Sequence, residues 1–285
     1  MQAVVITGAS SGIGRAIAEY LARRGWTVFA GIRKPEDGKA LTETVPAIRP
    51  ILLDVTRPEH IETAIAEVGA ALGDARLAGL INNAGIAKMG PLALQPLDEI
   101  RSHFEVNVFG AIAASQAFAP LLGMDTARTG QPGRIINITS VGGKLASPFL
   151  GAYTATKHAM ESVTDTLRRE LLVYGIDAIA VGPGAVKTPI WDKAEDANGD
   201  APYQDTAWAE PIQKFSDTML AGGRDGLEPE HIARIVETAL TADKPKARYA
   251  PVPDKLTNFT IPTRLPKRWL DSIFASRFGI KRRPA

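Results

Sequence analysis

A tyrosine and a lysine stand four positions apart in the stretch GAYTATKHAM, residues 151–160. On a helix this spacing places Tyr153 and Lys157 one turn apart on the same face. A phenol is a poor base at neutral pH because its ordinary pKa is about 10, and a nearby ammonium group favours the phenolate form. The pair could therefore exchange a proton with a substrate, or it could only pack a tyrosine ring on a lysine stem.

A serine could join this pair. Ser140 follows the apolar run RIINIT, residues 134–139, which is typical of a buried strand. Open α/β sheets bind ligands at the carboxyl ends of their strands, so the Ser140 hydroxyl could hold a substrate oxygen there. Carbonyl reduction needs a proton donor near the oxygen, for which Tyr153 is suited, and a hydride donor near the carbon. Ser140 alone could equally be a helix cap.

Three glycines, Gly8, Gly12 and Gly14, lie between an apolar run and a helical pattern in TGASSGIGRAIA. Glycine lets a backbone approach a phosphate closely, and a helix N-terminus offers free N–H groups and the positive end of its dipole. Ser10 and Ser11 could add hydroxyl contacts. The spacing is neither GxGxxG nor the Walker pattern. The turn is thus consistent with a phosphate site, and an ordinary tight strand–helix turn is the alternative.

The end of the second apolar run bears on which nicotinamide cofactor is used. NAD sites usually place an acid there for the ribose 2′-hydroxyl, whereas an arginine suits a 2′-phosphate. Ile32 occupies the acid's place and Arg33 and Lys34 follow, while Glu36 and Asp37 are expected to begin the next helix. Arg33 can pair with a phosphate through two hydrogen bonds. We expect NADP(H), with NAD(H) as the alternative; otherwise Arg33 is a solvated surface charge.

Alternating strands and helices must position these residues. The expected strands are apolar throughout, as strands buried on both faces should be, at 3–7, 27–32, 48–54, 77–82, 134–139, 176–182 and 247–252. Amphipathic segments between them predict helices, one ending near Gly25 and another with Thr56 as N-cap and Pro58 in its first turn. The pattern predicts an α/β fold with a doubly wound parallel seven-stranded sheet and helices on both faces.

Composition excludes several classes of function. The 285 residues include no cysteine, which excludes disulfides and cysteine metal sites, and the four scattered histidines predict no metal site. A net charge of +2 argues against nucleic acid binding. No uninterrupted apolar run approaches a membrane span, and the start MQAVVIT does not resemble a secretory signal. We therefore expect a cytoplasmic protein.

Several motifs in one order, TGASSGIG, LDVT, NNAG, NVFG, NITS, YTATK and GPGAVKTP, resemble the short-chain dehydrogenase/reductase family over roughly residues 1–250. The resemblance implies a single Rossmann-type domain that binds NAD(H) or NADP(H) and interconverts alcohols and ketones. Two other readings remain: an epimerase or dehydratase that uses bound cofactor transiently, and a non-catalytic nucleotide-sensing regulator.

The resemblance also implies roles for individual residues. The catalytic set is Asn107, which would support a proton-relay water, with Ser140, Tyr153 and Lys157. The implied cofactor contacts are Gly8, Ser10, Ser11, Gly12, Ile13, Gly14, Arg33, Asp54, Val55, Asn82, Ala84, Gly85, Tyr153, Lys157, Pro183, Gly184, Val186 and Thr188. Lys157 would hydrogen-bond the nicotinamide ribose.

Residues 190–226 break the strand–helix rhythm and are expected to form a substrate lid within a domain spanning 1–252. Their apolar side chains, Trp191, Tyr203, Trp208, Phe215 and Met219, suit a bulky apolar substrate, and residues 145–156 hold no Arg or Lys that could clamp a carboxylate. PGAVKTPIW and AGIRKP resemble the steroid and retinoid branch of the family. Alternatively, the aromatics bury this segment against the fold or another subunit.

The last segment, 253–285, is expected to be a basic amphipathic extension. Residues 264–285 hold seven Lys or Arg and one Asp, and Leu265, Trp269, Leu270, Ile273, Phe274 and Phe278 recur at helical spacing. Such a helix could contact an anionic membrane through 263–285, cover the substrate entrance or pack on another subunit. The helices around Asn107 and Tyr153 resemble the family's subunit contacts, which implies a homodimer or homotetramer.

Overall fold

The computed structural model describes residues 2–188 and 203–282 and contains the predicted seven-stranded sheet. All described strand pairs are parallel, in the order β3-β2-β1-β4-β5-β6-β7. The strands are β1 (Ala3–Ile6), β2 (Thr27–Ile32), β3 (Ile48–Leu52), β4 (Gly79–Asn82), β5 (Arg134–Ile138), β6 (Asp177–Val181) and β7 (Arg248–Tyr249). Each lies inside its predicted run, so the prediction of an α/β fold of this kind is confirmed.

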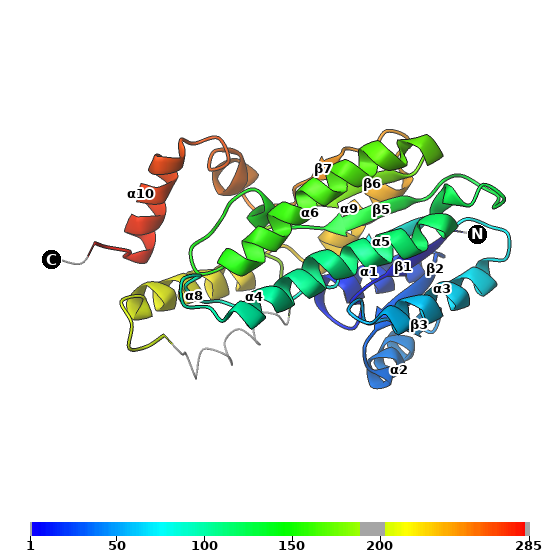
Figure 1. The fold of residues 1–285 in the computed structure, drawn as a ribbon, viewed down its shortest axis with the longest axis horizontal. Coiled ribbons are helices and arrows are strands. Elements are labelled where there is room, and N and C mark those ends of the chain that lie inside the picture. The colour runs from blue at the N-terminus through cyan, green and yellow to red at the C-terminus, as the bar shows by residue number, and fades with distance from the viewer. Residues whose placement is uncertain (1, 189–202, 283–285) are drawn as a thin grey trace.

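Helices cover both faces of the sheet (Figure 1). They are α1 (Gly12–Arg23), α2 (Pro35–Thr44), α3 (Pro58–Leu72), α4 (Leu97–Phe104), α5 (Gly110–Ala119), α6 (Gly151–Glu170), α8 (Ala209–Arg224), α9 (Pro229–Thr241) and α10 (Lys267–Phe278). Short helical turns are η1 (Glu105–Phe109), η2 (Pro120–Met124), η3 (Val141–Gly143), η4 (Leu171–Tyr174) and η5 (Leu256–Thr260). The chain therefore alternates strand and helix through most of the sheet, as parallel pairing requires.

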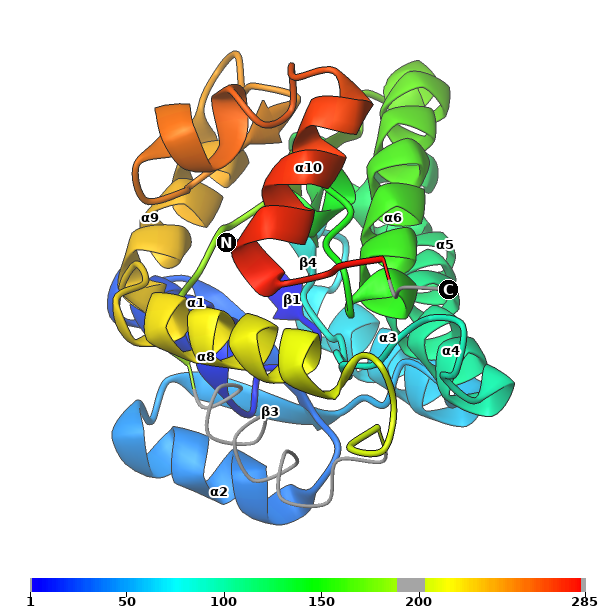
Figure 2. The same ribbon diagram turned by 90° about the vertical axis from the view of Figure 1, so that its left-hand side faces the viewer.

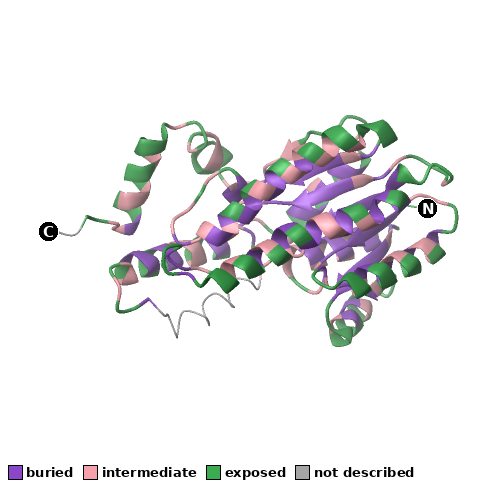
Figure 3. Ribbon diagram, in the orientation of Figure 1, coloured by how far each residue is buried: buried purple, intermediate pink, exposed green. Residues whose placement is uncertain are grey.

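Successive strand residues enter different cores. In β1, Val4 and Ile6 pack with α1 and α9, whereas Ala3 and Val5 pack with α3 and α5. Figure 3 shows the strands buried between helices whose outer faces are exposed. Burial on both faces explains why the inner strands are apolar without alternation. The prediction is wrong for the edge strand β3, where Arg49 and Leu52 are exposed because no further strand or helix of the described residues covers them.

Two predicted helix ends can be compared with the structure. Gly25 lies one residue beyond the C-cap of α1 with φ of 86°, a left-handed conformation that glycine tolerates, and its N–H donates to Ala22. The prediction for Thr56 is wrong: α3 begins at Pro58 after Arg57, and the Thr56 hydroxyl donates to the Asp54 carboxylate at 2.7 Å. The Thr56 hydroxyl thus binds the loop before the helix and does not cap the helix N–H groups.

A continuous helical segment, Leu97–Met124, is long and apolar enough to cross a membrane by length and composition alone. Its window is 61% buried inside the protein. Phe118 and Ala114 pack against the sheet, and Val108 and Ala111 pack against α6. Packing on two neighbours accounts for its apolar character.

The substrate-side segments gather at one end of the molecule, where Figures 1 and 2 show α8 and α10. Phe215 of α8 lies edge-to-face with Phe149, with ring centroids 5.8 Å apart, and with Phe278 of α10 at 5.1 Å. Because Phe149 follows β5, this aromatic cluster lies beyond the carboxyl ends of the strands. The second half of the predicted lid is thus a regular helix, and Trp191 lies outside the described residues.

Candidate active site

The three residues of the predicted catalytic set that follow β5 lie near one another. Ser140 comes two residues after β5 ends, and Tyr153 and Lys157 lie in the first two turns of α6. Ser140 adopts an extended backbone and caps η3, since its Oγ accepts from the Gly142 N–H at 3.0 Å. Ser140 thus caps a short helix, as one interpretation expected, and its side chain also hydrogen-bonds with Tyr153. Its contact with a substrate oxygen stays a prediction.

The phenol of Tyr153 is in an environment that favours its neutral form. Burial raises the pKa of Tyr153, and the hydrogen bond with the Ser140 side chain only partly opposes this effect. The expectation that Lys157 lowers this pKa is not met, because the Lys157 Nζ lies 5.6 Å from the tyrosine ring centroid and burial dominates. A neutral phenol is the form that donates a proton.

Lys157 is a buried lysine held by the backbone. Its side chain is 6% exposed, and its Nζ donates to the Ile138 carbonyl at 2.8 Å, at the end of β5. Burial lowers the pKa of Lys157 to about 8, and the negative charge of Glu161 limits that decrease. The ammonium group is thus tied to the same strand end that carries Ser140.

Asn107 lies in the π-helical turn η1 and is almost fully buried. Its side chain pairs with the backbone of Ile86, accepting from the N–H at 2.8 Å and donating to the carbonyl at 2.9 Å. It also donates to the Thr156 hydroxyl at 3.0 Å. Asn107 therefore fastens the loop after β4 to α6 between Tyr153 and Lys157.

The three glycines of the turn have different surroundings: Gly8 and Gly14 are closely packed, whereas Gly12 is not. A Cβ on Gly14 would overlap the Asn83 side chain and the Gly8 carbonyl, and one on Gly8 would lie 2.8 Å from the Ala84 Cα. These two glycines therefore allow α1 to dock against the loop after β4. Gly12 instead has φ of 57° and faces Thr188, whose Cγ2 would lie 3.5 Å from such a Cβ.

The N-terminus of α1 fits an anion. Ser11 is its N-cap and makes no side-chain cap hydrogen bond, which leaves first-turn N–H groups for a ligand. Ser10 is half-buried, Ser11 is exposed, and Ile13 packs against the core. Gly12 and Thr188, two predicted cofactor contacts far apart in sequence, border this N-terminus together.

At the neighbouring strand ends, Arg33 is exposed just after β2 and Asp54 follows β3. Burial raises the pKa of the Asp54 carboxyl, but hydrogen bonds from Thr56 and the charge of Arg33 outweigh this, so the net pKa is lowered. Glu36 and Asp37 lie in the first turn of α2, as expected. A cation beside the glycine turn and no acid at the end of β2 fit a 2′-phosphate.

The remaining predicted cofactor residues differ in exposure. Ala84 and Gly85 are accessible on the loop after β4, whereas Asn82 is buried and its Nδ2 donates to Ser115 and Asn137 at 2.9 Å each. Val55 is buried beside Gly110, and Val186 is buried in the core. Pro183 accepts a backbone hydrogen bond from Val141, and Gly184 donates one to Pro251. Asn82, Val55 and Val186 thus support the fold around the site.

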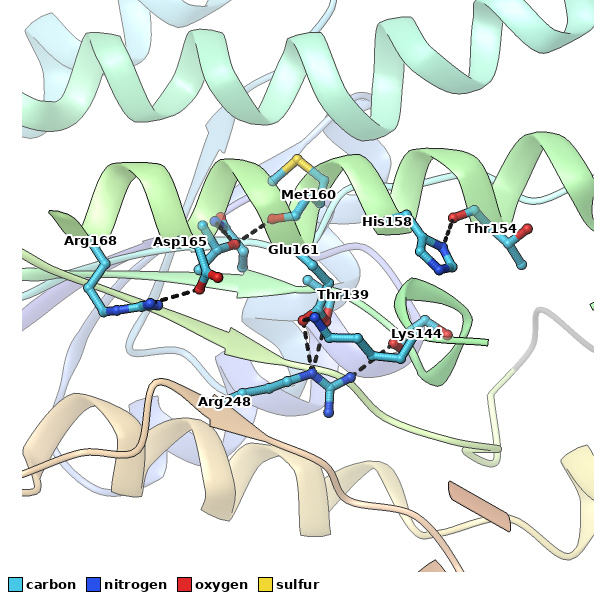
Figure 4. Close-up of polar contacts among 12 residues, drawn as sticks. Thr139, Lys144, Thr154, His158, Met160, Glu161, Asp165, Arg168 and Arg248 are labelled. Atoms are coloured by element: carbon cyan, nitrogen blue, oxygen red, sulfur yellow. Dashed lines mark hydrogen bonds and ion pairs between the residues drawn. The ribbon is translucent and has the colours of Figure 1, made fainter. Parts of the chain in front are cut away.

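A buried polar cluster beside the site is absent from the sequence predictions (Figure 4). Glu161, one turn beyond Lys157 on α6, contacts Thr139, Lys144 and Arg248. The only signal in the sequence is a carboxylate four positions after Lys157 on the same helix face. Nothing in the sequence indicates that Arg248, 87 positions away, is its partner.

The predicted lid aromatics form a buried cluster with two other segments. Tyr203, Phe215 and Phe278 are buried in it, and Trp208 and Met219 pack against it. Phe149 contributes from the loop between Ser140 and Tyr153, with φ of 61°, a conformation that bulky residues rarely adopt. The aromatics therefore bury α8 against the fold, as the alternative interpretation expected, and they do so beside the catalytic loop.

The chain is similar to known proteins along nearly its whole length. The family model for short chain dehydrogenase matches residues 2–199. An NADPH-dependent 3-dehydrocapnine reductase from Ornithobacterium rhinotracheale is 38% identical over 275 residues, 96% of each chain. Retinol dehydrogenase 5 from Mus musculus is 32% identical and covers 95% of this chain and 86% of its own. The structure of a short-chain dehydrogenase from Streptomyces avermitilis covers 96% of this chain and 94% of its own, at 30% identity and a TM-score of 0.74.

Proposed function

The chain belongs to the short-chain dehydrogenase family and is an oxidoreductase; on that premise, we propose that it interconverts a bulky apolar ketone and its secondary alcohol with NADP(H). The observation that carries the proposal is the hydrogen-bonded side-chain pair of Ser140 and Tyr153, with Lys157 one turn further along α6. This arrangement lies at the same carboxyl edge of the parallel sheet as the N-terminus of α1, which has no side-chain cap.

Each side chain has a distinct role in this mechanism. When bound, the reduced nicotinamide supplies the hydride. Ser140 holds the substrate oxygen through its hydroxyl, and Tyr153 donates its proton to that oxygen as the carbonyl is reduced. The raised pKa of Tyr153 keeps the phenol protonated for this direction. Lys157 lies beside the phenol and would hold the nicotinamide ribose through its ammonium group.

We assign the cofactor preference to Arg33. The N-terminus of α1 would take the pyrophosphate, and Arg33 would pair with the 2′-phosphate, since no acid occupies the end of β2. The similarity to an NADPH-dependent reductase supports the same preference. Asn107 fixes the loop after β4, and the accessible predicted contacts would border the adenine and nicotinamide ends.

The proposed substrate is bulky and apolar because the segments around the catalytic loop are aromatic. Phe149, Phe215 and Phe278 would form the wall behind the substrate, and the described loop after Ser140 offers no cation to clamp a carboxylate between residues 145 and 156. The similarity to a retinol dehydrogenase supports this class. A steroid, a retinoid or a related lipid-like carbonyl compound fits these features.

We also propose two partners, for a chain that works in the cytoplasm. The side chain of Phe109 is 54% exposed next to Asn107, which suits a homodimer or homotetramer built on α5 and α6. In the extension that follows the 1–252 domain, Phe278 is buried, but Trp269 and Ile273 are exposed among basic residues. This face of α10 suits an anionic membrane surface.

A screen of bulky ketones against NADPH and NADH, followed by NAD(P)H fluorescence, tests the enzymatic proposal. We expect NADPH-dependent reduction, which Tyr153→Phe abolishes while NADPH binding persists. A fully active Tyr153→Phe variant would refute the role of this phenol. Flotation with vesicles of anionic or neutral lipid tests the membrane contact: Trp269→Ser/Ile273→Ser should weaken anionic binding, and unchanged flotation would contradict that contact.

A further inference from the structure

Glu161 is a buried carboxylate that contacts side chains from three other segments of the chain (Figure 4). Its Oε1 accepts from the Thr139 hydroxyl at 2.7 Å, and both of its oxygens lie within 3.0 Å of the Arg248 Nε. The Lys144 Nζ lies 3.2 Å from Oε2. The Glu161 side chain is 7% exposed and that of Arg248 is 19% exposed, so water weakens this ion pair little.

The cluster reaches both parts of the catalytic arrangement. Arg248 also donates to the backbone carbonyl of Ser140 at 3.2 Å, and Thr139 immediately precedes Ser140. Glu161 lies one turn beyond Lys157 on α6, and its charge raises the pKa of the Lys157 ammonium group against the effect of burial. One carboxylate is therefore connected to the strand end that carries Ser140 and to the helix that carries Lys157.

The surrounding backbone leaves little room for the cluster to shift. A Cβ on Gly143 would lie 2.9 Å from both the Glu161 Cγ and the Lys157 carbonyl oxygen, and a Cβ on Gly182 would overlap the Arg248 guanidinium. On its far side, Arg248 lies over the ring of Phe259, 4.9 Å from its centroid, in the C-terminal extension. The pair is thus held between the catalytic loop and the extension.

We propose that Glu161 and Arg248 are positioning residues that fix the Ser140 strand end relative to α6 and keep Lys157 charged at its buried site. This inference rests on the proposed function. The charged and titratable groups near Lys157 are Tyr153 and Glu161 on its own helix, while Arg248 from β7 and Lys144 after η3 face Glu161. The carboxylate favours the ammonium form, and the two cations weaken that effect.

These charges determine the direction in which each substitution shifts the pH dependence of activity. Removing the negative charge in Glu161→Gln lowers the pH at which Lys157 loses its proton, so the alkaline limb of kcat/KM should move down by about one pH unit. Removing a cation in Arg248→Gln or in the more exposed Lys144→Gln should move the limb up. Arg248→Gln should also lower kcat, because the Ser140 carbonyl loses its donor. A purely structural role would not produce shifts of opposite sign.

The experiment is a pH profile of ketone reduction by the full-length protein, with NADPH binding followed by fluorescence over the same pH range. The ketone is the one reduced fastest in the screen. Asp165→Asn is the matched control, because Asp165 lies one turn beyond Glu161 and pairs with Arg168 and Arg169 at a more exposed position. It should leave both profiles unchanged, and Glu161→Asp should restore most of the wild-type profile.

The outcomes separate this inference from the proposed function. An active wild-type enzyme whose limb stays in place in folded Glu161→Gln and Lys144→Gln variants would overturn the positioning role alone. A wild-type protein that binds NADPH but reduces no ketone would contradict the proposed function. In that case the pH dependence of NADPH binding still tests the positioning role of Glu161 and Arg248, since Lys157 is the proposed ribose contact. An NADPH-binding profile that Glu161→Gln does not shift would overturn that role.

Discussion

Replacing Lys157 with methionine should stabilise the fold at neutral pH while abolishing catalysis. The side chain of Lys157 is 6% exposed, and burial lowers its pKa from 10.5 to about 8. The folded state therefore binds the proton less tightly than the unfolded state. Below pH 8 both states are charged, so the cost of burying the ammonium group is fully present; as pH rises from 8 towards 10.5, the folded state becomes neutral and this cost disappears.

The magnitude follows from that difference in pKa. A separation of about 2.5 pK units corresponds to about 3.4 kcal/mol at neutral pH, and about 2 kcal/mol of it is recovered by pH 9.5. Methionine removes the charge but leaves the Ile138 carbonyl without its 2.8 Å donor, which costs about 1–2 kcal/mol at every pH. Lys157→Met should therefore be about 1–2 kcal/mol more stable than wild type at pH 7, and about equally stable by pH 9.5.

Urea denaturation of both proteins at several values between pH 7 and 9.5 measures this loss of the stability difference. Only the difference between the two proteins is compared, so other titrating groups cancel. Lys39→Met serves as the control, since Lys39 is exposed on α2 and its effect should vary little with pH. A Lys157→Met variant less stable than wild type at pH 7, or a stability difference that does not change with pH, would refute the idea that burial of this charge is costly.

Three further substitutions, one of them with a matched control, have definite expected results. Arg33→Asp should raise the KM for NADPH about 10–100-fold and favour NADH, and an unchanged cofactor ratio would mean that the 2′-phosphate site lies elsewhere. Gly14→Ala should cost about 2 kcal/mol in urea denaturation and weaken NADPH binding, because its methyl group displaces the turn. Gly222→Ala, in open space on α8, should cost nothing; equal effects would contradict the packing argument. Asn107→Ala leaves the Ile86 peptide without partners and should cost about 2–4 kcal/mol in the same assay, whereas wild-type stability would argue that water replaces the amide.

The sheet was predictable because its strands are short apolar runs separated by helical patterns. Such runs are typical of strands that are buried on both faces of a parallel sheet. Only the run 27–32 matches its strand, and the other six were one to four residues too long. The residue pattern does not show where pairing stops, since Leu53 and Ala250 are apolar beyond the ends of β3 and β7. Thr56 was assigned to the wrong partner because Asp54, two residues earlier, competes for the same hydroxyl. A local pattern cannot decide between the helix N–H groups, from which an N-cap hydroxyl accepts, and the Asp54 carboxylate, to which the hydroxyl donates.

The sequence alone determined which groups could do the chemistry. These groups are recognised from local features: the spacing of Tyr153 and Lys157, the serine at a strand end and the glycine turn. Each depends only on residues that are near one another in sequence. Only the tertiary structure decided their electrostatics. Burial raises the pKa of Tyr153 where a neighbouring lysine suggested a decrease, and the carboxylate that keeps Lys157 charged is balanced by an arginine 87 positions away. Charge–charge and desolvation energies depend on distance and burial in space, and these exist only once the chain has folded.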